Sequence, residues 1–314
     1  MELAWRLLTE DGTAAGGRKA AAEYEGAAAI AAEAEITGMT GSASLLELPA
    51  AVGGHPAVSV GKNAFRGNDR IVRVILPDSV RTVGTFAFYD CRRLEEADLG
   101  GGVREVLFGA FRSCPSLSLI RIRVENGDFS PVRDVLQDID AAVTFRIALP
   151  DGEACLYFPS FVNGFEEDTM ARAIHPVIEG CGMAYREIVT RKELGIRAYD
   201  RLFSRAAQDG VRTASETAFS RLLCPYRLSD TDREQYERWL SEHSERVLPM
   251  LVKDGAEERI RYLLDRRLAG RDAVTEGLSA CAEARRTELS GLLMNYEARE
   301  FGTGRGTEFS LDLL

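Results

Sequence analysis

The sequence predicts an α+β protein in which a short β-solenoid precedes an all-α array of helical hairpins. Two observations predict this class. One motif recurs at a spacing of 23 residues between Val60 and Ile122, and short apolar stripes at helical spacing fill residues 165–300. The chain has 314 residues, of which 45% are hydrophobic, so both parts can bury a core.

The repeat is clearest in three related blocks. Phe65, Phe88 and Phe111 follow one another at intervals of 23 residues, and an alanine precedes each of them. The other columns at this spacing are Asn68, Cys91 and Cys114; Ile71, Leu94 and Leu117; Val74, Ala97 and Ile120; and Leu76, Leu99 and Ile122. Residues two apart in a strand share a face, so stacked copies place the apolar columns in one core and the phenylalanines in a ladder on its far side.

These blocks resemble the BspA-type leucine-rich repeats, whose pattern is V-x-x-I-G-x-x-A-F-x-x-C-x-x-L-x-x-I-x-I-P. The residues of the second block that follow the pattern are Val80, Val83, Gly84, Ala87, Phe88, Cys91, Leu94 and Leu99. The resemblance covers about residues 36–124 and implies a leucine-rich-repeat solenoid, to which we assign residues 36–128. It implies a recognition surface rather than a particular activity, and members of the family are often secreted or located on the cell surface.

Residues 1–35 are expected to cap the N-terminal end of the solenoid. Their alanine-rich stretch has high helix propensity, whereas Ile30, Ala32, Ala34 and Ile36 alternate as they would in a strand. We favour a cap that contains a strand, and a helix is the alternative.

Residues 129–164 are expected to form a β-hairpin connector. Val143–Leu149 and Ala154–Phe158 are β-rich, and Pro150–Glu153 between them has the composition of a turn. A solenoid of three repeats has an open end, which this hairpin or the helices after it could cover.

Residues 165–300 are expected to form the helical array. Ser229 and Asp230 have the character of a helix cap, and apolar residues at helical spacing follow them. Asp254–Leu264 is similar to the second helix of an ankyrin-type pair. This resemblance covers residues 230–296 and implies ankyrin-like stacked hairpins, although the T-P-L-H signature is absent. Residues 301–314 are expected to be a flexible tail, whose last apolar residues could dock elsewhere.

Charge and composition argue against several classes of function. The formal net charge is −10, whereas sequence-independent binding to nucleic acid needs lysine and arginine to neutralise phosphates. No apolar stretch approaches the ~20 residues of a membrane span, so we do not expect membrane insertion. The N-terminus lacks the basic segment of a secretory signal, and the six cysteines do not form a disulfide framework, so we expect a cytoplasmic protein.

Motifs that carry chemistry are not apparent in the sequence. His55, His175 and His243 are isolated, and there is no Gly-x-Ser-x-Gly elbow, so we expect no catalytic residue, no metal site and no cofactor. Cys91 and Cys114 share a repeat column and could approach closely enough for a disulfide, but we expect buried thiols there.

One surface is a candidate for binding. In each repeat the residues between the core positions of the strand point outward, and they vary in size and charge while the core columns stay apolar. These predicted partner-binding residues are Arg73, Ile75, Glu96, Asp98, Leu119 and Arg121. A rigid sheet that presents varied side chains at fixed spacing favours recognition, and an ordinary solvated sheet is the alternative. We expect Ile75 and Leu119 to be exposed apolar contacts.

We therefore expect a non-catalytic scaffold that binds a protein partner through the solenoid face and could bind another through the helical array. The identity of the partner and the oligomeric state do not follow from the sequence. Two alternatives stay open: a cell-surface or secreted adhesin-like protein, and an enzyme whose site lies between the two domains.

Overall fold

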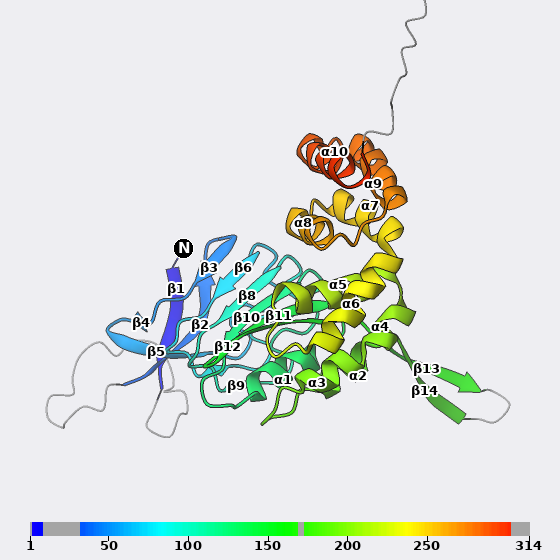
Figure 1. The fold of residues 1–314 in the computed structure, drawn as a ribbon. Helices are drawn as coiled ribbons and strands as arrows, with labels where there is room; N and C mark the ends of the chain where they lie inside the picture. The colour runs from blue at the N-terminus through cyan, green and yellow to red at the C-terminus, as the bar shows by residue number, and fades with distance from the viewer. Residues whose placement is uncertain (1, 9–31, 169–172, 303–314) are drawn as a thin grey trace, which may run out of the picture. The chain divides into compact units, whose positions relative to one another are not determined.

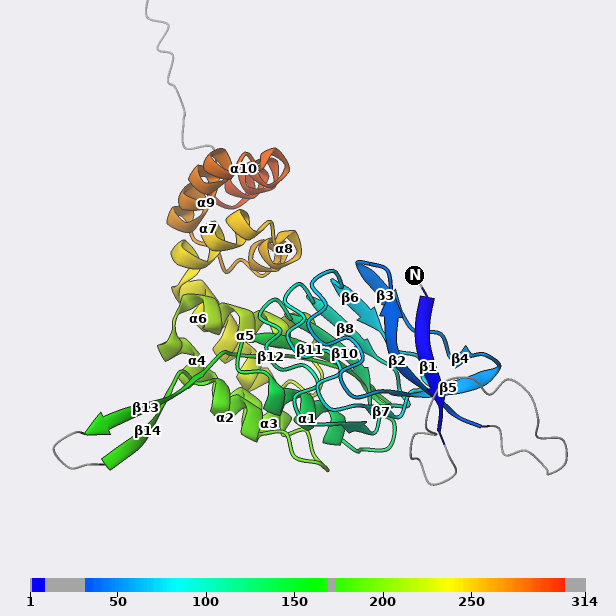
Figure 2. The ribbon, with the colours of Figure 1, turned by 180° about the vertical axis from the view of Figure 1, so that it is seen from behind.

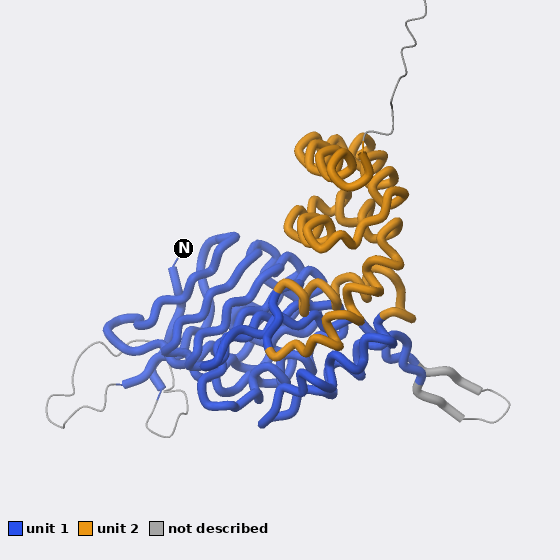
Figure 3. Tube along the Cα trace, viewed as in Figure 1, with its two compact units in different colours: residues 1–206, 224–226 blue, residues 207–223, 227–314 orange. Residues whose placement is uncertain are grey.

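The structure is a computed structural model that describes residues 2–8, 32–168 and 173–302. The chain divides into two compact units (Figure 3). The first consists of residues 1–206 with 224–226, and the second of residues 207–223 with 227–314. The described strands belong to the first unit, and the described part of the second unit is helical, which confirms the α+β class.

Sheet I is one wall of the solenoid (Figure 1). Its strands lie in the order β3 (Leu45–Glu47), β6 (Arg73–Ile75), β8 (Glu96–Leu99), β10 (Leu119–Arg123), β11 (Val143–Leu149) and β12 (Gly152–Phe158). Strands β3 to β11 pair in parallel, and β12 pairs antiparallel with β11. Strands β6, β8 and β10 come from successive copies of the repeat, as stacking requires.

Sheet II is the opposite wall (Figure 1 and Figure 2). Its strands lie in the order β1 (Glu2–Leu7), β2 (Ala34–Thr40), β5 (His55–Val60), β7 (Thr82–Val83) and β9 (Glu105–Val106), with β4 (Ala51–Val52) paired to β5. The chain alternates between the two sheets, which defines the predicted solenoid. Strand β1 lies in the N-terminal segment and pairs antiparallel with β2, whereas residues 9–31, with most of the alanine-rich stretch, lie outside the described residues.

The apolar columns of the repeat form the core between the two sheets. Ile71, Leu94 and Leu117 are at most 1% exposed. The phenylalanine ladder is confirmed, because the ring of Phe88 stacks on those of Phe65 and Phe111 with centroids 5.2 and 5.3 Å apart. Each fully buried ring contributes about 1.5–3 kcal/mol relative to an exposed one.

Glycine at Gly84 allows neighbouring repeats to approach each other closely. An added Cβ at Gly84 would lie only 2.6 Å from the carbonyl oxygen of Val60 in the preceding repeat. The short distance between the backbones of stacked repeats therefore explains the glycine at this position of the pattern.

The cysteine column consists of buried free thiols, as expected. The thiols of Cys91 and Cys114 donate to the carbonyl oxygens of Phe65 and Phe88 in the preceding repeats, at 3.1 Å each. Burial raises the pKa of Cys91 to about 11 and that of Cys114 to about 12. Asn68 holds the first place in the column, and its side-chain oxygen accepts instead from the backbone N–H groups two and three residues later.

Residues 129–164 contain the predicted hairpin and two features that the sequence did not indicate. Strands β11 and β12 pair from Val143 with Phe158 to Leu149 with Gly152. Strand β11 also pairs in parallel with β10, so it continues the solenoid rather than only connecting it to the helices. A helix, α1 (Ser130–Asp138), precedes β11 and buries its apolar side chains.

Helix α1 also caps the stack of turn segments that carry the phenylalanines, at the last segment of that stack. Between repeats, the N–H of Phe88 donates to the carbonyl oxygen of Ala110 in the next copy. Gly109 and Phe111 belong to the last such segment, and their N–H groups donate to the carboxylate oxygens of Asp138 at 2.9 and 3.2 Å. The carboxylate therefore takes the place of the carbonyl groups of a further repeat.

The helices begin later than residue 165, which corrects the predicted boundary of the array. Strands β13 (Val162–Asp168) and β14 (Ala173–Glu179) form a separate antiparallel pair before the next helices, α2 (Gly182–Glu187), α3 (Ile196–Arg201) and α4 (Phe203–Asp209). The sequence of β14 is rich in β-branched residues, which favour strands, and contains Pro176, which disfavours a helix interior.

Strand β12 is the edge of sheet I, and side chains from later in the chain cover its free backbone groups. The Tyr199 hydroxyl of α3 accepts from the N–H of Tyr157 at 3.1 Å and donates to its carbonyl oxygen at 2.6 Å. The thiol of Cys224 donates to the carbonyl oxygen of Glu153 at 3.1 Å. These contacts satisfy groups that an open sheet edge would leave for another chain.

The part of the second unit that the structure describes consists of short helices joined by tight turns. They are α5 (Val211–Leu223), α6 (Asp230–Glu242), α7 (Ser244–Asp254), α8 (Glu257–Asp265), α9 (Arg271–Ala284) and α10 (Thr287–Phe301). The predicted cap is confirmed, since the Ser229 hydroxyl accepts from the N–H of Asp232 at 3.1 Å. Gly255 ends α7 with a φ of 69°. The ankyrin-like classification stays a prediction, and residues 303–314 of the expected tail lie outside the described residues.

Candidate protein-binding face

The outward-facing residues of sheet I form two rows across its strands. The register places Leu45, Arg73, Glu96, Leu119, Thr144 and Tyr157 in one row, and Glu47, Ile75, Asp98, Arg121, Arg146 and Cys155 in the other. Because neighbouring strands lie about 4.8 Å apart, each row is a line of side chains at that spacing. The structure thus brings all six predicted residues together, and we call the two rows the candidate face.

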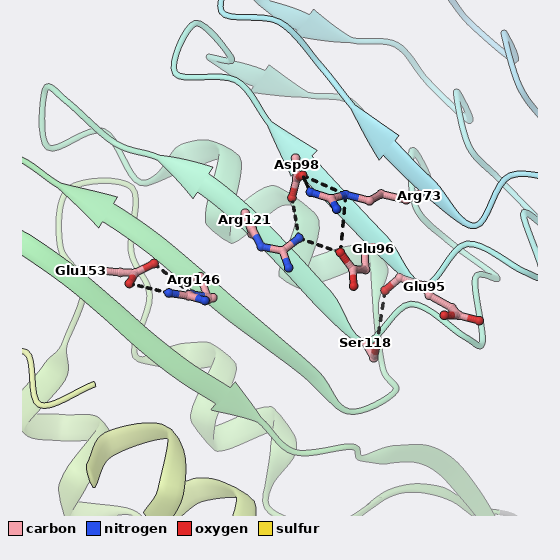
Figure 4. A network of polar contacts seen from close by, with 8 residues as sticks. All are labelled: Arg73, Glu95, Glu96, Asp98, Ser118, Arg121, Arg146 and Glu153. Carbon is pink, nitrogen blue, oxygen red and sulfur yellow. Dashed lines mark hydrogen bonds and ion pairs between the residues drawn. The ribbon is translucent and has the colours of Figure 1, made fainter. Parts of the chain in front are cut away.

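The four predicted charged residues of the candidate face pair with one another (Figure 4). The guanidinium of Arg121 donates to the carboxylates of Glu96 at 2.7 Å and Asp98 at 2.8 Å. The guanidinium of Arg73 also donates to Asp98 and lies 3.5 Å from the carboxylate of Glu96. Each carboxylate therefore bridges two arginines, and the four formal charges cancel.

The network keeps Asp98 ionised and its arginine neighbours oriented. Burial disfavours the carboxylate, but hydrogen bonds from Arg121 and Arg73 outweigh that effect and lower the pKa of Asp98 below its usual value. The four side chains are still 19–42% exposed, so solvent screens the pairs, and each contributes about 0.2–1 kcal/mol. These ion pairs therefore fix the orientation of the four side chains more than they stabilise the fold.

The apolar residues of the face are less exposed than the sequence indicated. Ile75 and Leu119 are half-buried, because each is flanked by side chains on both neighbouring strands. Leu45, on the edge strand β3, is 47% exposed and is the more accessible apolar residue of the face.

Strands β11 and β12 extend the candidate face beyond the predicted residues. Arg146 donates through Nε and Nη2 to the two carboxylate oxygens of Glu153, at 3.0 and 2.8 Å (Figure 4). This pairing raises the pKa of Arg146. Sequence reasoning missed the extension because β11 lacks the repeat motif, although its alternation of polar and apolar residues was a usable signal.

A cluster of reactive side chains lies at the β12 end of the face. The sulfur atoms of Cys155 and Cys224 and the Glu153 carboxylate lie within 4.8 Å of one another, and among the described residues these are side chains of the kinds that bind metal ions. Both oxygens of that carboxylate already accept from Arg146, which leaves the two thiols. The sequence could not indicate this cluster, since Glu153 and Cys224 are 71 residues apart.

The fold and the repeated columns define a class of protein. Parallel strands alternate between two walls, and leucine, phenylalanine and cysteine columns recur at one spacing, as in a leucine-rich-repeat solenoid. A family described as a BspA type leucine rich repeat region (6 copies) matches residues 55–129. The repeat region of this protein therefore belongs to the BspA-type leucine-rich repeats, as the sequence resemblance predicted.

Three solved structures of leucine-rich-repeat proteins are similar to part of the chain. The protein from T. pallidum is 31% identical over 38% of this chain and 50% of its own, with a TM-score of 0.29. A protein from Bacteroides capillosus is 28% identical over 29% of this chain and 70% of its own, with a TM-score of 0.27. A protein from Bacteroides ovatus is 19% identical over 40% of this chain and 34% of its own, with a TM-score of 0.30.

The present chain thus matches half the length of the T. pallidum protein. No curated protein matches the chain. Among the helices that the structure describes, none combines the length and the apolar character that crossing a membrane demands.

Proposed function

We propose that this protein is a non-catalytic interaction module that binds a protein partner through the candidate face. The observation that carries the proposal is the contrast between the two sides of the same strands. The inward columns stay apolar in every repeat, whereas the outward rows change from strand to strand and carry ordered charges. A BspA-type repeat region supports an interaction or surface-repeat role in general.

The ion-pair network suits recognition because its side chains are oriented before a partner arrives. Immobilising a long side chain on binding costs about 0.5–1.5 kcal/mol. Arg73 and Arg121 are already held by carboxylates and still keep part of their surface exposed. The alternation of sign from β6 to β10 favours a partner with a mixed charge pattern, and the net charge of −10 favours basic regions around its contact site through steering.

A charge inversion tests the proposal. The four substitutions Arg73→Glu, Glu96→Lys, Asp98→Lys and Arg121→Glu reverse every charge of the network while opposite charges stay adjacent. We therefore expect the variant to stay folded, with a circular dichroism spectrum and a melting temperature close to those of the native protein. We also expect it to lose a partner that the native protein captures from a lysate of the source organism, as read by mass spectrometry.

The matched control inverts an ion pair of the second unit. Arg212 donates to Asp254 at 2.7 Å, and the double substitution Arg212→Asp with Asp254→Arg should keep the partner. A partner that stays with the folded charge-inverted variant would show that the candidate face is not the binding surface. The helical array as a further binding surface and the cytoplasmic location stay predictions, and fractionation of cells checks the latter.

A further inference from the structure

Two of the six cysteines differ from the rest in their surroundings. All six lie within the described residues, and four of them are buried. Cys155 and Cys224 are half-buried, and their sulfur atoms lie within 4.8 Å of each other. Cys155 projects from the outward row of β12, and Cys224 lies in the connection between α5 and α6. The chain therefore holds one pair of adjacent thiols that solvent can reach.

Consecutive contacts hold the connection 224–226 against the hairpin of β11 and β12. The Cys224 thiol donates to the carbonyl oxygen of Glu153 at 3.1 Å, and the Tyr226 hydroxyl donates to the carboxylate of Asp151 at 2.8 Å. The Tyr226 ring also lies against Gly152, where an added Cβ would be 3.2 Å from it. Cys224 is thus held beside Cys155, with the two sulfur atoms within 4.8 Å of each other.

The surroundings favour a thiolate on Cys224. Hydrogen bonding from the Cys155 thiol, supported by the Cys155 N–H and the charge of Arg146, outweighs burial and the nearby Glu153 carboxylate and lowers the pKa of Cys224 to about 7. The same thiol–thiol hydrogen bond raises the pKa of Cys155. Because the thiolate is the reactive form, Cys224 has the character of an attacking residue and Cys155 that of a resolving one.

The cluster is better suited to oxidation than to holding a metal ion. A metal would need a third protein ligand, and both oxygens of the nearby Glu153 carboxylate accept from Arg146. A disulfide needs only the two sulfur atoms, and neither of them is covered by core packing.

We propose that Cys155 and Cys224 form a reversible disulfide, with a hydroperoxide as the oxidant. The Cys224 thiolate attacks one oxygen of hydrogen peroxide and breaks the O–O bond, which leaves a sulfenic acid and a hydroxide that takes up a proton to become water. The Cys155 thiol then attacks the sulfenic sulfur, the S–S bond forms, and a second water leaves. Two thiols and one peroxide thus give one disulfide and two waters, and a thiol reductant reverses the change. Cys155 belongs to the outward row of the candidate face, but the disulfide does not rest on the proposed partner-binding role.

Peptide mapping of the full chain tests the proposal. The reduced protein is treated with hydrogen peroxide at neutral pH, unfolded, alkylated at its free thiols and digested with trypsin. Cleavage after arginine places Cys155 in the fragment 147–172 and Cys224 in the fragment 222–227, and each fragment contains one cysteine. We expect these two fragments to be joined with the loss of two hydrogen atoms, and dithiothreitol to separate them. The four buried cysteines should be recovered as alkylated free thiols.

Two variants make the result specific. Cys155→Ser removes the resolving thiol, so it should abolish the linkage and leave a sulfenic acid on Cys224 that dimedone labels. Cys281→Ser removes a buried thiol and should keep the linkage. The proposal is wrong if the folded native protein gives no linkage between the two fragments, or if the buried cysteines are oxidised as fast as this pair.

Discussion

Asp138 offers the sharpest test of how the solenoid ends. Its two carboxylate oxygens accept from the N–H groups of Gly109 and Phe111, at 2.9 and 3.2 Å, where the repeat would otherwise continue. The substitution Asp138→Ala removes both acceptors and leaves two N–H groups without a partner from the protein, next to the buried end of the phenylalanine ladder. We therefore expect a loss of stability confined to the first unit.

The magnitude of the expected loss in the free energy of unfolding follows from two opposing effects. A hydrogen bond to a charged group contributes about 1.5–3 kcal/mol, so two of them contribute roughly 3–6 kcal/mol. Burial opposes the charge and raises the pKa of Asp138 despite these hydrogen bonds, so part of that stabilisation is already offset. We expect Asp138→Ala to lower the free energy of unfolding by about 2–4 kcal/mol, and Asp138→Asn, which keeps one acceptor, by about half as much.

Urea denaturation followed by circular dichroism measures the global effect, and amide hydrogen exchange measures the local one. The amides of Gly109 and Phe111 should exchange faster in Asp138→Ala, whereas the amide of Phe88, which donates to Ala110, should change little. Gln137→Ala, at an exposed position of the same helix, is the control and should stay within about 0.5 kcal/mol of the native protein. If Asp138→Ala and Gln137→Ala unfold alike, Asp138 does not cap the solenoid.

Three further predictions follow from the core, the candidate face and the thiol pair. Phe88→Ala removes the middle ring of the stacked ladder, which is fully buried, so urea titration should show a loss of about 3–5 kcal/mol; a loss below 1 kcal/mol would contradict the stacking. Because the pKa of Asp98 is lowered in the folded protein, its carboxylate stabilises the fold at pH values above the ordinary aspartate pKa of about 4. This stabilisation is lost as the pH falls through the folded-state pKa. The melting temperature of Asp98→Asn should therefore depend less on pH between 5 and 2 than that of the native protein, and equal slopes would refute the argument. Alkylation of Cys224 by iodoacetamide should reach half its maximal rate near pH 7, and Cys155→Ala should move that midpoint upward because it removes the thiol hydrogen bond; an unchanged midpoint would argue against that cause.

Much of the solenoid could be predicted because each repeat interacts mainly with its immediate neighbours. The stacking of Phe65, Phe88 and Phe111 requires the same residue at the same place in every copy, so the requirement is visible as a period in the sequence. The outward position of the six predicted face residues follows from the same alternation and is confirmed by the strand register.

The features that the sequence did not reveal depend on contacts that occur once in the chain and do not recur from repeat to repeat. Strand β11 continues sheet I without the motif, because backbone pairing with β10 needs no particular side chains. The separate pair β13 and β14 stands where helices were expected, since local β-branched content outweighed the helical pattern assumed for that region.

Sequence alone therefore determined the class of fold, the spacing of the core columns and the residues that the sheet would present. Only the tertiary structure decided what those residues do with one another. Arg73, Glu96, Asp98 and Arg121 neutralise each other across three strands, and Asp138 takes the place of a missing repeat. Cys155 and Cys224 meet because the α5–α6 connection packs against the hairpin. The physical reason is that every repeat must place apolar residues at the same buried positions, which leaves a period in the sequence. Each of these polar contacts occurs once, between residues that only the folding of the chain brings together.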